Sequence, residues 1–256
     1  VGLLVVVLAS RTVLRNLEWK DGFSLWSKTV ITSPESDRAH NNLGIAYDKR
    51  GLLDDAMAEY RKALDINPIH VDAHNNLGVA YDKIGLLDEA MAEYRKALNI
   101  NPNYVDAHNN LGAAYYKKGL LDEAMAEYRK ALNINPNFAS AHNNLGAAYD
   151  KRGLLDEAMA EYRKALNINP KIADYHYNLA NMLFASDKVK EAIIEYKKAV
   201  SLNPLDSDFH RNLGIAYIRT GEISKAKEIL IDLKKMSPDK AKELELFLTG
   251  TKKNRY

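Results

Sequence analysis

Histidine is the side chain of this sequence most suited to acid–base or metal chemistry, and six of the seven histidines recur at one interval. The interval is 34 residues, and the six are His40, His74, His108, His142, His176 and His210. Ligands of one metal ion must converge within a few ångströms. Helical elements that stack side by side lie about 10 Å apart. We therefore interpret the histidines as a packing column and expect no metal site.

Acidic pairs recur in the same way and resemble paired catalytic carboxylates. Asp88-Glu89 and Asp122-Glu123 come where a helix is expected to begin. There an acidic side chain can cap free amides, and its charge suits the helix dipole. A catalytic centre needs one such site, whereas this motif is repeated. The sequence also contains no glycine-rich phosphate loop and no nucleophile with a neighbouring base. We expect neither catalysis nor a cofactor.

Paired asparagines are the more informative repeated feature. The pairs begin at Asn41, and the second asparagine of each pair belongs to a column of Asn42, Asn76, Asn110, Asn144, Asn178 and Asn212. Asparagine is a mediocre helix former, so its repetition inside a helix indicates a task for the amide. An amide can donate and accept at once, which suits it to a peptide backbone. Hydrogen bonding between adjacent repeats is the alternative, and the two are compatible.

The prolines define the elements that must position these columns. All seven lie at intervals of 34 residues, from Pro34 to Pro238, which is typical of stacked helical hairpins. Within each period, small and apolar residues follow helical spacing, a glycine permits a turn, and the proline ends the second helix. We expect an all-α fold with a half repeat at 20–36, a cap helix and tail at 241–256, and six repeats between them. The repeats are 37–70, 71–104, 105–138, 139–172, 173–206 and 207–240.

The repeated pattern resembles the tetratricopeptide repeat family. The second repeat carries the family motif at His74, Leu77, Gly78, Tyr81, Ala90, Tyr94, Ala97 and Pro102. The resemblance implies helix-turn-helix repeats in a right-handed superhelical solenoid, whose first helices line a groove for a protein or peptide. The run AHNNLG is also similar to the repeats of the O-linked N-acetylglucosamine transferases. In those enzymes an asparagine column holds the backbone of an extended peptide, so the column is expected to line the groove here.

The fifth repeat departs from the others. Ala180 and Asp187 replace both of its glycines, and aromatic residues are added. We expect side chains that vary along the groove to provide selective contacts, although the fifth repeat can instead alter local curvature. The variable positions are Tyr116, Tyr177, Asn181 and Phe184.

The chain opens with a run that is apolar on every side, which includes Leu3, Leu4, Val5, Val6, Val7 and Leu8. We expect residues 1–19 to form an apolar helix. It is too short to cross a bilayer, which takes about 20 apolar residues. It is either the remainder of a membrane helix or signal sequence, or a helix that docks on another copy. Head-to-tail docking builds homo-oligomers such as rings or filaments. A membrane-attached, cell-surface or other extracytoplasmic location is expected.

Charge and flanking sequence leave two functional hypotheses. The net charge is +2 and the basic residues are dispersed, so nucleic acid is not an expected partner. The first hypothesis is a non-enzymatic interaction scaffold that binds an extended peptide or partner helix and self-associates. The second rests on residues 10–34, which resemble the junction before the repeats of multi-spanning O-mannosyl-type glycosyltransferases. The chain is then the acceptor-binding C-terminal region of a membrane-embedded enzyme, and the catalytic part lies outside it.

Overall fold

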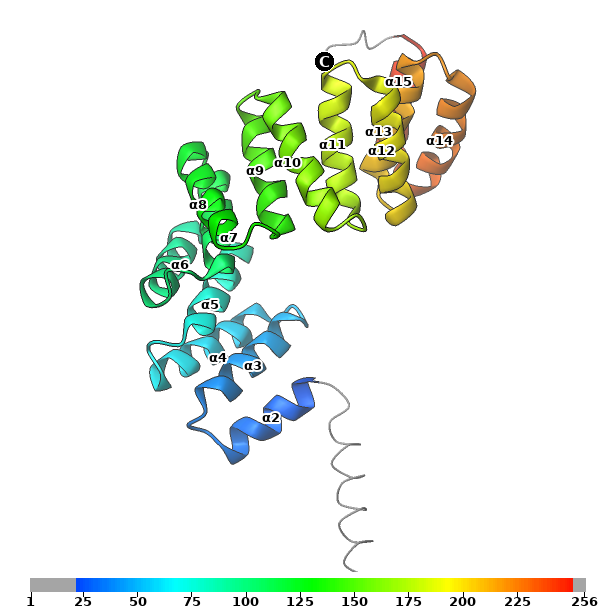
Figure 1. Cartoon of the computed structure of the whole chain (residues 1–256). Coiled ribbons are helices and arrows are strands. Elements are labelled where there is room, and N and C mark those ends of the chain that lie inside the picture. Colours follow the sequence, from blue (N-terminus) through cyan, green and yellow to red (C-terminus); the bar gives the residue numbers. More distant parts are fainter. Residues whose placement is uncertain (1–21, 251–256) are drawn as a thin grey trace, which may run out of the picture. The chain divides into compact units, whose positions relative to one another are not determined.

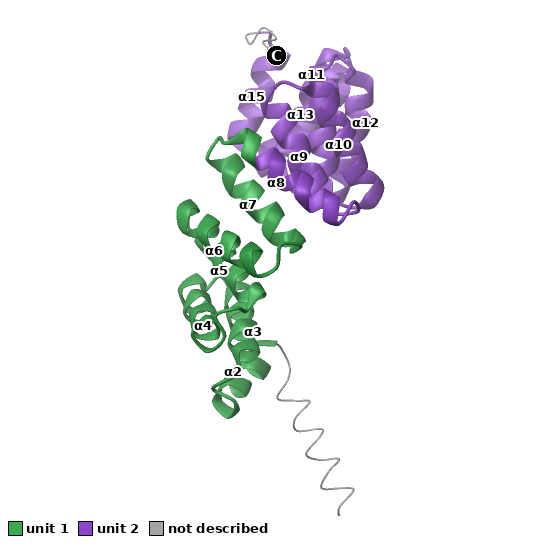
Figure 2. Ribbon diagram, turned by 60° about the vertical axis from the view of Figure 1, so that its left-hand side comes forward, with its two compact units in different colours: residues 1–123 green, residues 124–256 purple. Residues whose placement is uncertain are grey.

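A computed structural model describes residues 22–250, which form fourteen helices, α2 to α15, and no strand (Figure 1). The all-α prediction is confirmed. The chain divides into two compact units, residues 1–123 and 124–256, with the division inside α8 (Leu121–Ile134) (Figure 2). The expected apolar helix at 1–19 and its residues Leu3 to Leu8 lie outside the described residues. Within 22–250, no helix is both long and apolar enough to cross a membrane.

The helices occur in antiparallel pairs whose first members start 34 residues apart. The first unit contains α2 (Gly22–Thr32), α3 (Asp37–Asp48), α4 (Leu53–Ile66), α5 (Val71–Lys83), α6 (Leu87–Ile100) and α7 (Val105–Lys117). After α8, the second unit contains α9 (Ala139–Lys151), α10 (Leu155–Ile168), α11 (Ala173–Ala185), α12 (Val189–Leu202), α13 (Ser207–Arg219), α14 (Ile223–Met236) and α15 (Pro238–Leu248).

The turn inside each pair needs a left-handed backbone. In the second repeat Gly85 provides it with a φ of +82°. The fifth repeat has no glycine at this position, and Asp187 adopts a φ of 63° instead. An aspartate tolerates this region better than most residues because its short side chain can hydrogen-bond locally. The turn therefore persists where the glycine is lost.

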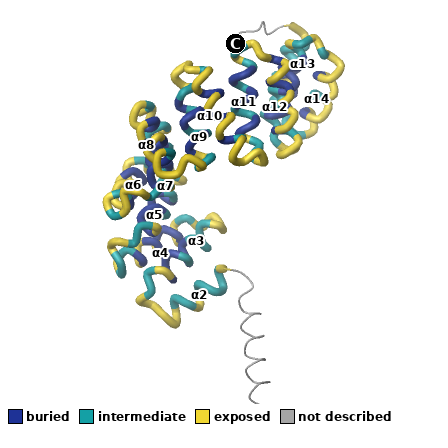
Figure 3. The backbone as a smooth tube through the Cα atoms, viewed as in Figure 1, coloured by how far each residue is buried: buried dark blue, intermediate teal, exposed yellow. Residues whose placement is uncertain are grey.

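The core of each repeat is built on a close approach between its two helices. A Cβ added to Gly78 on α5 would lie 2.6 Å from Cε1 of Tyr94 on α6. Tyr94 is 1% exposed, and Ala90 and Leu111 are buried in the same core cluster. Figure 3 shows the buried residues along the helix faces that meet. The glycine is thus required for packing rather than for its own backbone angles.

Two expectations about helix ends need correction. The N-caps of α4, α6 and α10 are Leu52, Leu86 and Leu154, and none makes a side-chain cap hydrogen bond. The predicted capping by aspartate is wrong there, because the aspartate lies inside the first turn, where its charge still suits the dipole. At the C-terminal end, α15 begins at Pro238 rather than at 241, since proline fits the first turn of a helix.

Candidate functional site

The asparagines of consecutive first helices are hydrogen-bonded to one another. Nδ2 of Asn76 donates to Oδ1 of Asn41 at 3.0 Å, and Nδ2 of Asn110 donates to Oδ1 of Asn75 at 3.0 Å. In the second unit, Nδ2 of Asn178 donates to Oδ1 of Asn143 at 2.9 Å. We call these linked amides the asparagine ladder. The bonding between repeats that the sequence left open is therefore present.

The ladder uses only part of the hydrogen-bonding capacity of each donor amide. A carboxamide has two N–H groups and one oxygen, and the ladder takes one N–H. Within residues 22–250, no group donates to Oδ1 of Asn76, Asn110 or Asn178. These three side chains are half-buried, whereas the acceptor Asn75 is 6% exposed. The ladder thus fixes the orientation of each amide and leaves one donor and one acceptor available.

Ion pairs between repeats border the ladder. On α5, Asn76, Val79 and Lys83 share one face, because they are three and four residues apart. Nζ of Lys83 lies 2.6 Å from Asp48, and Nζ of Lys117 lies 2.7 Å from Asp82. We call this face, with its equivalents in each unit, the asparagine face. Tyr116 is half-buried on α7, at the position of Asp82 in the preceding repeat.

The fifth repeat rebuilds the ladder with different side chains. Tyr177 stands where other repeats have the first asparagine, and its hydroxyl accepts from Nδ2 of Asn212 at 2.8 Å. Oδ1 of Asn181 accepts from the same Nδ2 at 3.1 Å and from the hydroxyl of Tyr196 at 2.7 Å. Burial raises the pKa of Tyr177, so the phenol stays protonated. The structure therefore brings Tyr177, Asn181 and Asn212 together.

The remaining predicted residues lie in α3, α9 and α11. The guanidinium of Arg219 lies over the ring of Phe184, with its Cζ 4.8 Å from the ring centroid. Asn42 is half-buried at the start of the column in α3, and Asn144 occupies the equivalent position in α9. A peptide-binding role for the column remains a prediction.

The histidine column pairs with a glutamate column that the packing interpretation did not predict. Nδ1 of His74 lies 2.6 Å from Oε2 of Glu93, and its Nε2 lies 3.0 Å from the carbonyl of Pro68. Both ring nitrogens face acceptors, so only the imidazolium can donate to both. The same pair of contacts recurs at His40, His142 and His176. A glutamate 19 residues after five of the six column histidines was the available sequence signal.

The sixth repeat breaks this pairing. Ile229 replaces the glutamate, and Nδ1 of the buried His210 has no hydrogen-bond partner. In the second repeat, Glu93 also accepts from Nζ of Lys96 at 2.7 Å. Burial opposes ionisation of Glu93, but the hydrogen bonds from His74 and Lys96 outweigh it and lower its pKa. Among the described residues, no three acidic or histidine side chains cluster as metal ligands would. The hydrogen bonds of His74 tie α5 to Glu93 of α6 and to the carbonyl of Pro68.

Known proteins match both the repeats and the fold. The TPR repeat family model matches residues 49–85, 83–119, 114–153, 151–186 and 180–221. The structure of pilF from Pseudomonas aeruginosa is 25% identical with a TM-score of 0.74, over 83% of this chain and 97% of that one. A thermophilic TPR protein of Thermus thermophilus, TTC0263, is 25% identical with a TM-score of 0.61, over 72% of this chain and 100% of that one. Solved structures therefore match the repeat fold over most of the chain.

Curated sequences match over shorter stretches. Protein O-mannosyl-transferase F38B6.6 of Caenorhabditis elegans is 35% identical over 65 residues, which is 25% of this chain and 9% of that protein. The two curated relatives that match are covered over 7% and 9% of their own lengths. The family model, by contrast, covers more than half of the chain. The chain therefore belongs to the tetratricopeptide repeat family, an all-α helical repeat solenoid of the kind that serves as a protein–protein interaction scaffold.

Proposed function

We propose that the chain is a non-enzymatic scaffold that holds an extended peptide along the asparagine face. The observation that supports this most is the ladder itself. One N–H of each amide is committed to the neighbouring repeat, so the other N–H and the oxygen keep a fixed direction. A donor and an acceptor on one rigid group match the N–H and C=O of a peptide backbone. Such a site binds backbone without requiring one sequence.

The spacing of the repeats also favours an extended segment over a partner helix. Stacked helical pairs lie about 10 Å apart, and a chain in the extended polyproline II conformation rises about 3.1 Å per residue with three residues per turn. One ladder amide would then meet every third residue of such a peptide, on the same side each time. A helix rises only about 1.5 Å per residue and has already used its backbone hydrogen-bonding groups. The ladder amides can therefore form more hydrogen bonds with an extended chain than with a helix.

A binder selected from a displayed library of linear 12-residue peptides tests the proposal. We expect the full chain to enrich binding peptides from this library. The affinity of one selected peptide for the Asn110→Ala and Asn75→Ala variants is then measured by calorimetry. Both substitutions remove the same ladder bond. Only Asn110→Ala removes a half-exposed amide of the asparagine face, so it should weaken binding about tenfold more than Asn75→Ala.

Two outcomes contradict the proposal. The first is a library that yields no binder. The second is equal affinity of the two variants for the selected peptide, because the amide of Asn110 would then act only through stability. The melting temperature of each variant is measured in parallel, so that a loss of folding is recognised.

A second candidate function follows from the similarity to the O-mannosyl-transferase. The chain would then be the acceptor-binding C-terminal region of a membrane-embedded glycosyltransferase, with its location at a membrane or outside the cytoplasm. The gene upstream of Val1 tests this. Several apolar spans ahead of residue 1 support it, and a short signal segment or an unrelated soluble domain contradicts it.

Self-association through residues 1–19 is a further part of the scaffold proposal. The apolar run in the sequence supports it, because an exposed apolar segment of this kind is typical of an interaction site. We expect the chain with an intact N-terminus to form oligomers in light scattering, and a chain that starts at Gly22 to be a monomer. A monomeric intact chain at the same concentration contradicts this part.

A further inference from the structure

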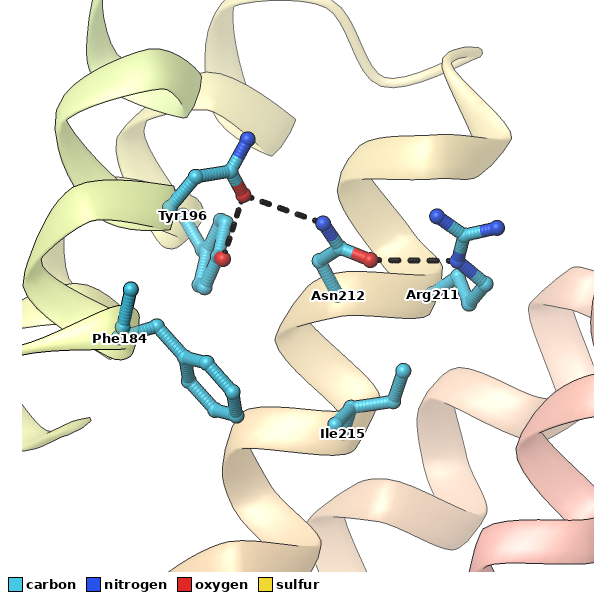
Figure 4. Close-up of a pocket in the computed structure, with 7 residues that line it drawn as sticks. Phe184, Tyr196, Arg211, Asn212 and Ile215 are labelled. Atoms are coloured by element: carbon cyan, nitrogen blue, oxygen red, sulfur yellow. Dashed lines mark hydrogen bonds between the residues drawn. The ribbon is translucent and has the colours of Figure 1, made fainter. Parts of the chain in front are cut away.

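A pocket of about 230 Å³ opens in the second unit between α11 and α13 (Figure 4). Asn181, Phe184 and Ala185 line it from α11, Tyr196 from α12, and Arg211 and Ile215 from α13. Pockets for whole small molecules usually measure about 300 to 1,000 Å³. This pocket therefore has the size for a single side chain.

Two residues that differ in the fifth repeat account for the apolar character of the pocket. In the first unit, Lys83 and Lys117 lie along the face and pair with Asp48 and Asp82 of the preceding repeat. The fifth repeat has Phe184 at the aspartate position and Ala185 at the lysine position. The lysine side chain is therefore absent at position 185, and a phenyl ring stands where the carboxylate would be. The cation of the next repeat remains, because Cζ of Arg219 lies 4.8 Å from the centroid of the Phe184 ring and its Nη2 pairs with Asp187. The pocket wall at positions 184 and 185 is apolar.

The polar end of the pocket is fixed and has a donor to spare. Oδ1 of Asn181 accepts from Tyr196 and from Asn212, so its carboxamide cannot flip without losing both bonds. Its Nδ2 carries two N–H groups, and one of them interacts with the hydroxyl of Tyr177, where it lowers the pKa that burial raises. The second N–H is left for a ligand. Asn181 is half-buried, and the three equivalent positions before it carry Val79, Ala113 and Ala147. The amide thus offers one N–H that these earlier repeats lack.

The charge of the pocket argues against an acidic occupant. The guanidinium of Arg211 donates through Nε to Asn212 at 3.2 Å and through Nη1 to Glu243 at 3.1 Å. Its Nη2 lies 3.3 Å from Asp208. A carboxylate in the pocket would compete with two carboxylates already bound to this cation. A neutral occupant disturbs none of these contacts.

We propose that this pocket takes a large apolar side chain, such as leucine or phenylalanine, from a peptide bound along the asparagine face. The side chain packs against Phe184 and Ile215, and Nδ2 of Asn181 donates to the backbone carbonyl of the same residue. The pocket then sets the register of a peptide whose other contacts are to its backbone. This inference rests on the proposed function, since it names the anchor of the same peptide.

Titration with single capped amino acids tests the pocket without a selected peptide. The probe is N-acetyl-leucine N-methylamide, and the readout is the NMR shift of the δ1 methyl group of Ile215 in the full chain. We expect saturable shifts at millimolar probe. Ala185→Lys restores the lysine of the earlier repeats at an exposed position and should weaken binding about tenfold, whereas Ala185→Ser should retain it. Equal shifts in the lysine variant, or stronger shifts with N-acetyl-aspartate N-methylamide, overturn the pocket.

Peptides selected by the full chain separate failure of the pocket from failure of the proposed function. If both are right, the peptides share one large apolar position, and Ala185→Lys weakens them about tenfold. If the peptides bind Ala185→Lys and the wild-type chain equally, the pocket is overturned and the scaffold stands. If no peptide is selected but the leucine probe still binds at Ile215, the pocket stands and the extended-peptide function is overturned.

Discussion

At the scale of residues, the histidine–glutamate pairs show how the repeats hold charge in their interior. Glu93 is 8% exposed and His74 is 7% exposed, so the hydrogen bond between them replaces part of what water would supply. Lys96 provides a second bond to Glu93, and the carbonyl of Pro68 a second bond to His74. Removal of one partner from a buried pair leaves an uncompensated polar group, which costs more than the pair itself contributes. The sixth repeat supplies a natural comparison, because His210 faces Ile229 instead of a glutamate.

The first prediction uses this comparison. We expect His74→Ala to destabilise the chain by about 2 kcal/mol more than His210→Ala, because only His74→Ala leaves a buried carboxylate without its partner. Both changes remove the same volume and the same bond to a proline carbonyl. Urea denaturation followed by circular dichroism measures the difference. Equal losses would show that the pairing with Glu93 adds nothing.

The second prediction concerns acid stability. The folded pKa of Glu93 lies below its ordinary value of 4.5, so its ionised form stabilises the fold above pH 4.5. That contribution is lost as the pH falls through the lowered pKa. Glu93→Gln should therefore be less stable than wild type at pH 7 and should lose less stability between pH 5 and pH 3. Glu89→Gln, at an exposed site on the same helix, is the control. A parallel pH dependence in wild type and Glu93→Gln would refute the assignment.

At the scale of elements, the contact between the glycine of the first helix and the tyrosine of the second sets how closely each pair approaches. The period of the sequence predicted both residues, because they recur at fixed positions in a helical pattern. The fifth repeat replaces this glycine–tyrosine contact with a different pair of residues. Its residue at the glycine position is Ala180, and the equivalent tyrosine, Tyr196, donates to Asn181. Sequence alone did not predict this bond, since it depends on which acceptor lies near the Tyr196 hydroxyl in the folded chain.

The third prediction tests the close approach. Gly78→Ala should cost about 2 kcal/mol, because its Cβ would lie 2.6 Å from the ring of Tyr94. Gly85→Ala meets no atom within 4 Å and should cost about 1 kcal/mol through its positive φ alone. A double-mutant cycle with Tyr94→Leu separates the two effects. We expect Gly78→Ala to be energetically coupled to Tyr94→Leu, and Gly85→Ala not to be. Additive effects of Gly78→Ala and Tyr94→Leu would rule out a steric clash with the ring.

At the scale of the whole molecule, the regular period predicted the fold class, but it did not predict the contacts of the candidate binding site. Repeats add stability mainly through their neighbours, so a sequence period reports the architecture directly. The asparagine column was also visible, but its bonds between repeats depend on which amide atoms face each other across the stack. The glutamate partners of the histidines lie on a different helix and were not predicted. The pocket arises from two exchanges, at Phe184 and Ala185, whose effect depends on their neighbours in space.

The fourth prediction follows from the near-identity of the second and third repeats. Deletion of residues 71–104 should leave a folded helical chain, because Asn110 can then donate to Asn41 as Asn76 does now. We expect cooperative unfolding with a smaller urea m-value, since less surface is buried. Circular dichroism with urea titration measures this. Loss of cooperative unfolding would mean that the repeats are not interchangeable.

Backbone methylation of a selected peptide tests the central claim most directly. Each amide of the peptide is N-methylated in turn, which removes one backbone donor and leaves the side chains unchanged, and the affinity for the full chain is measured by calorimetry. If the ladder holds the backbone, losses of about tenfold should recur at every third residue, in step with the repeats. Uniform tolerance of N-methylation, with binding lost only on side-chain substitution, would contradict recognition by the asparagine ladder.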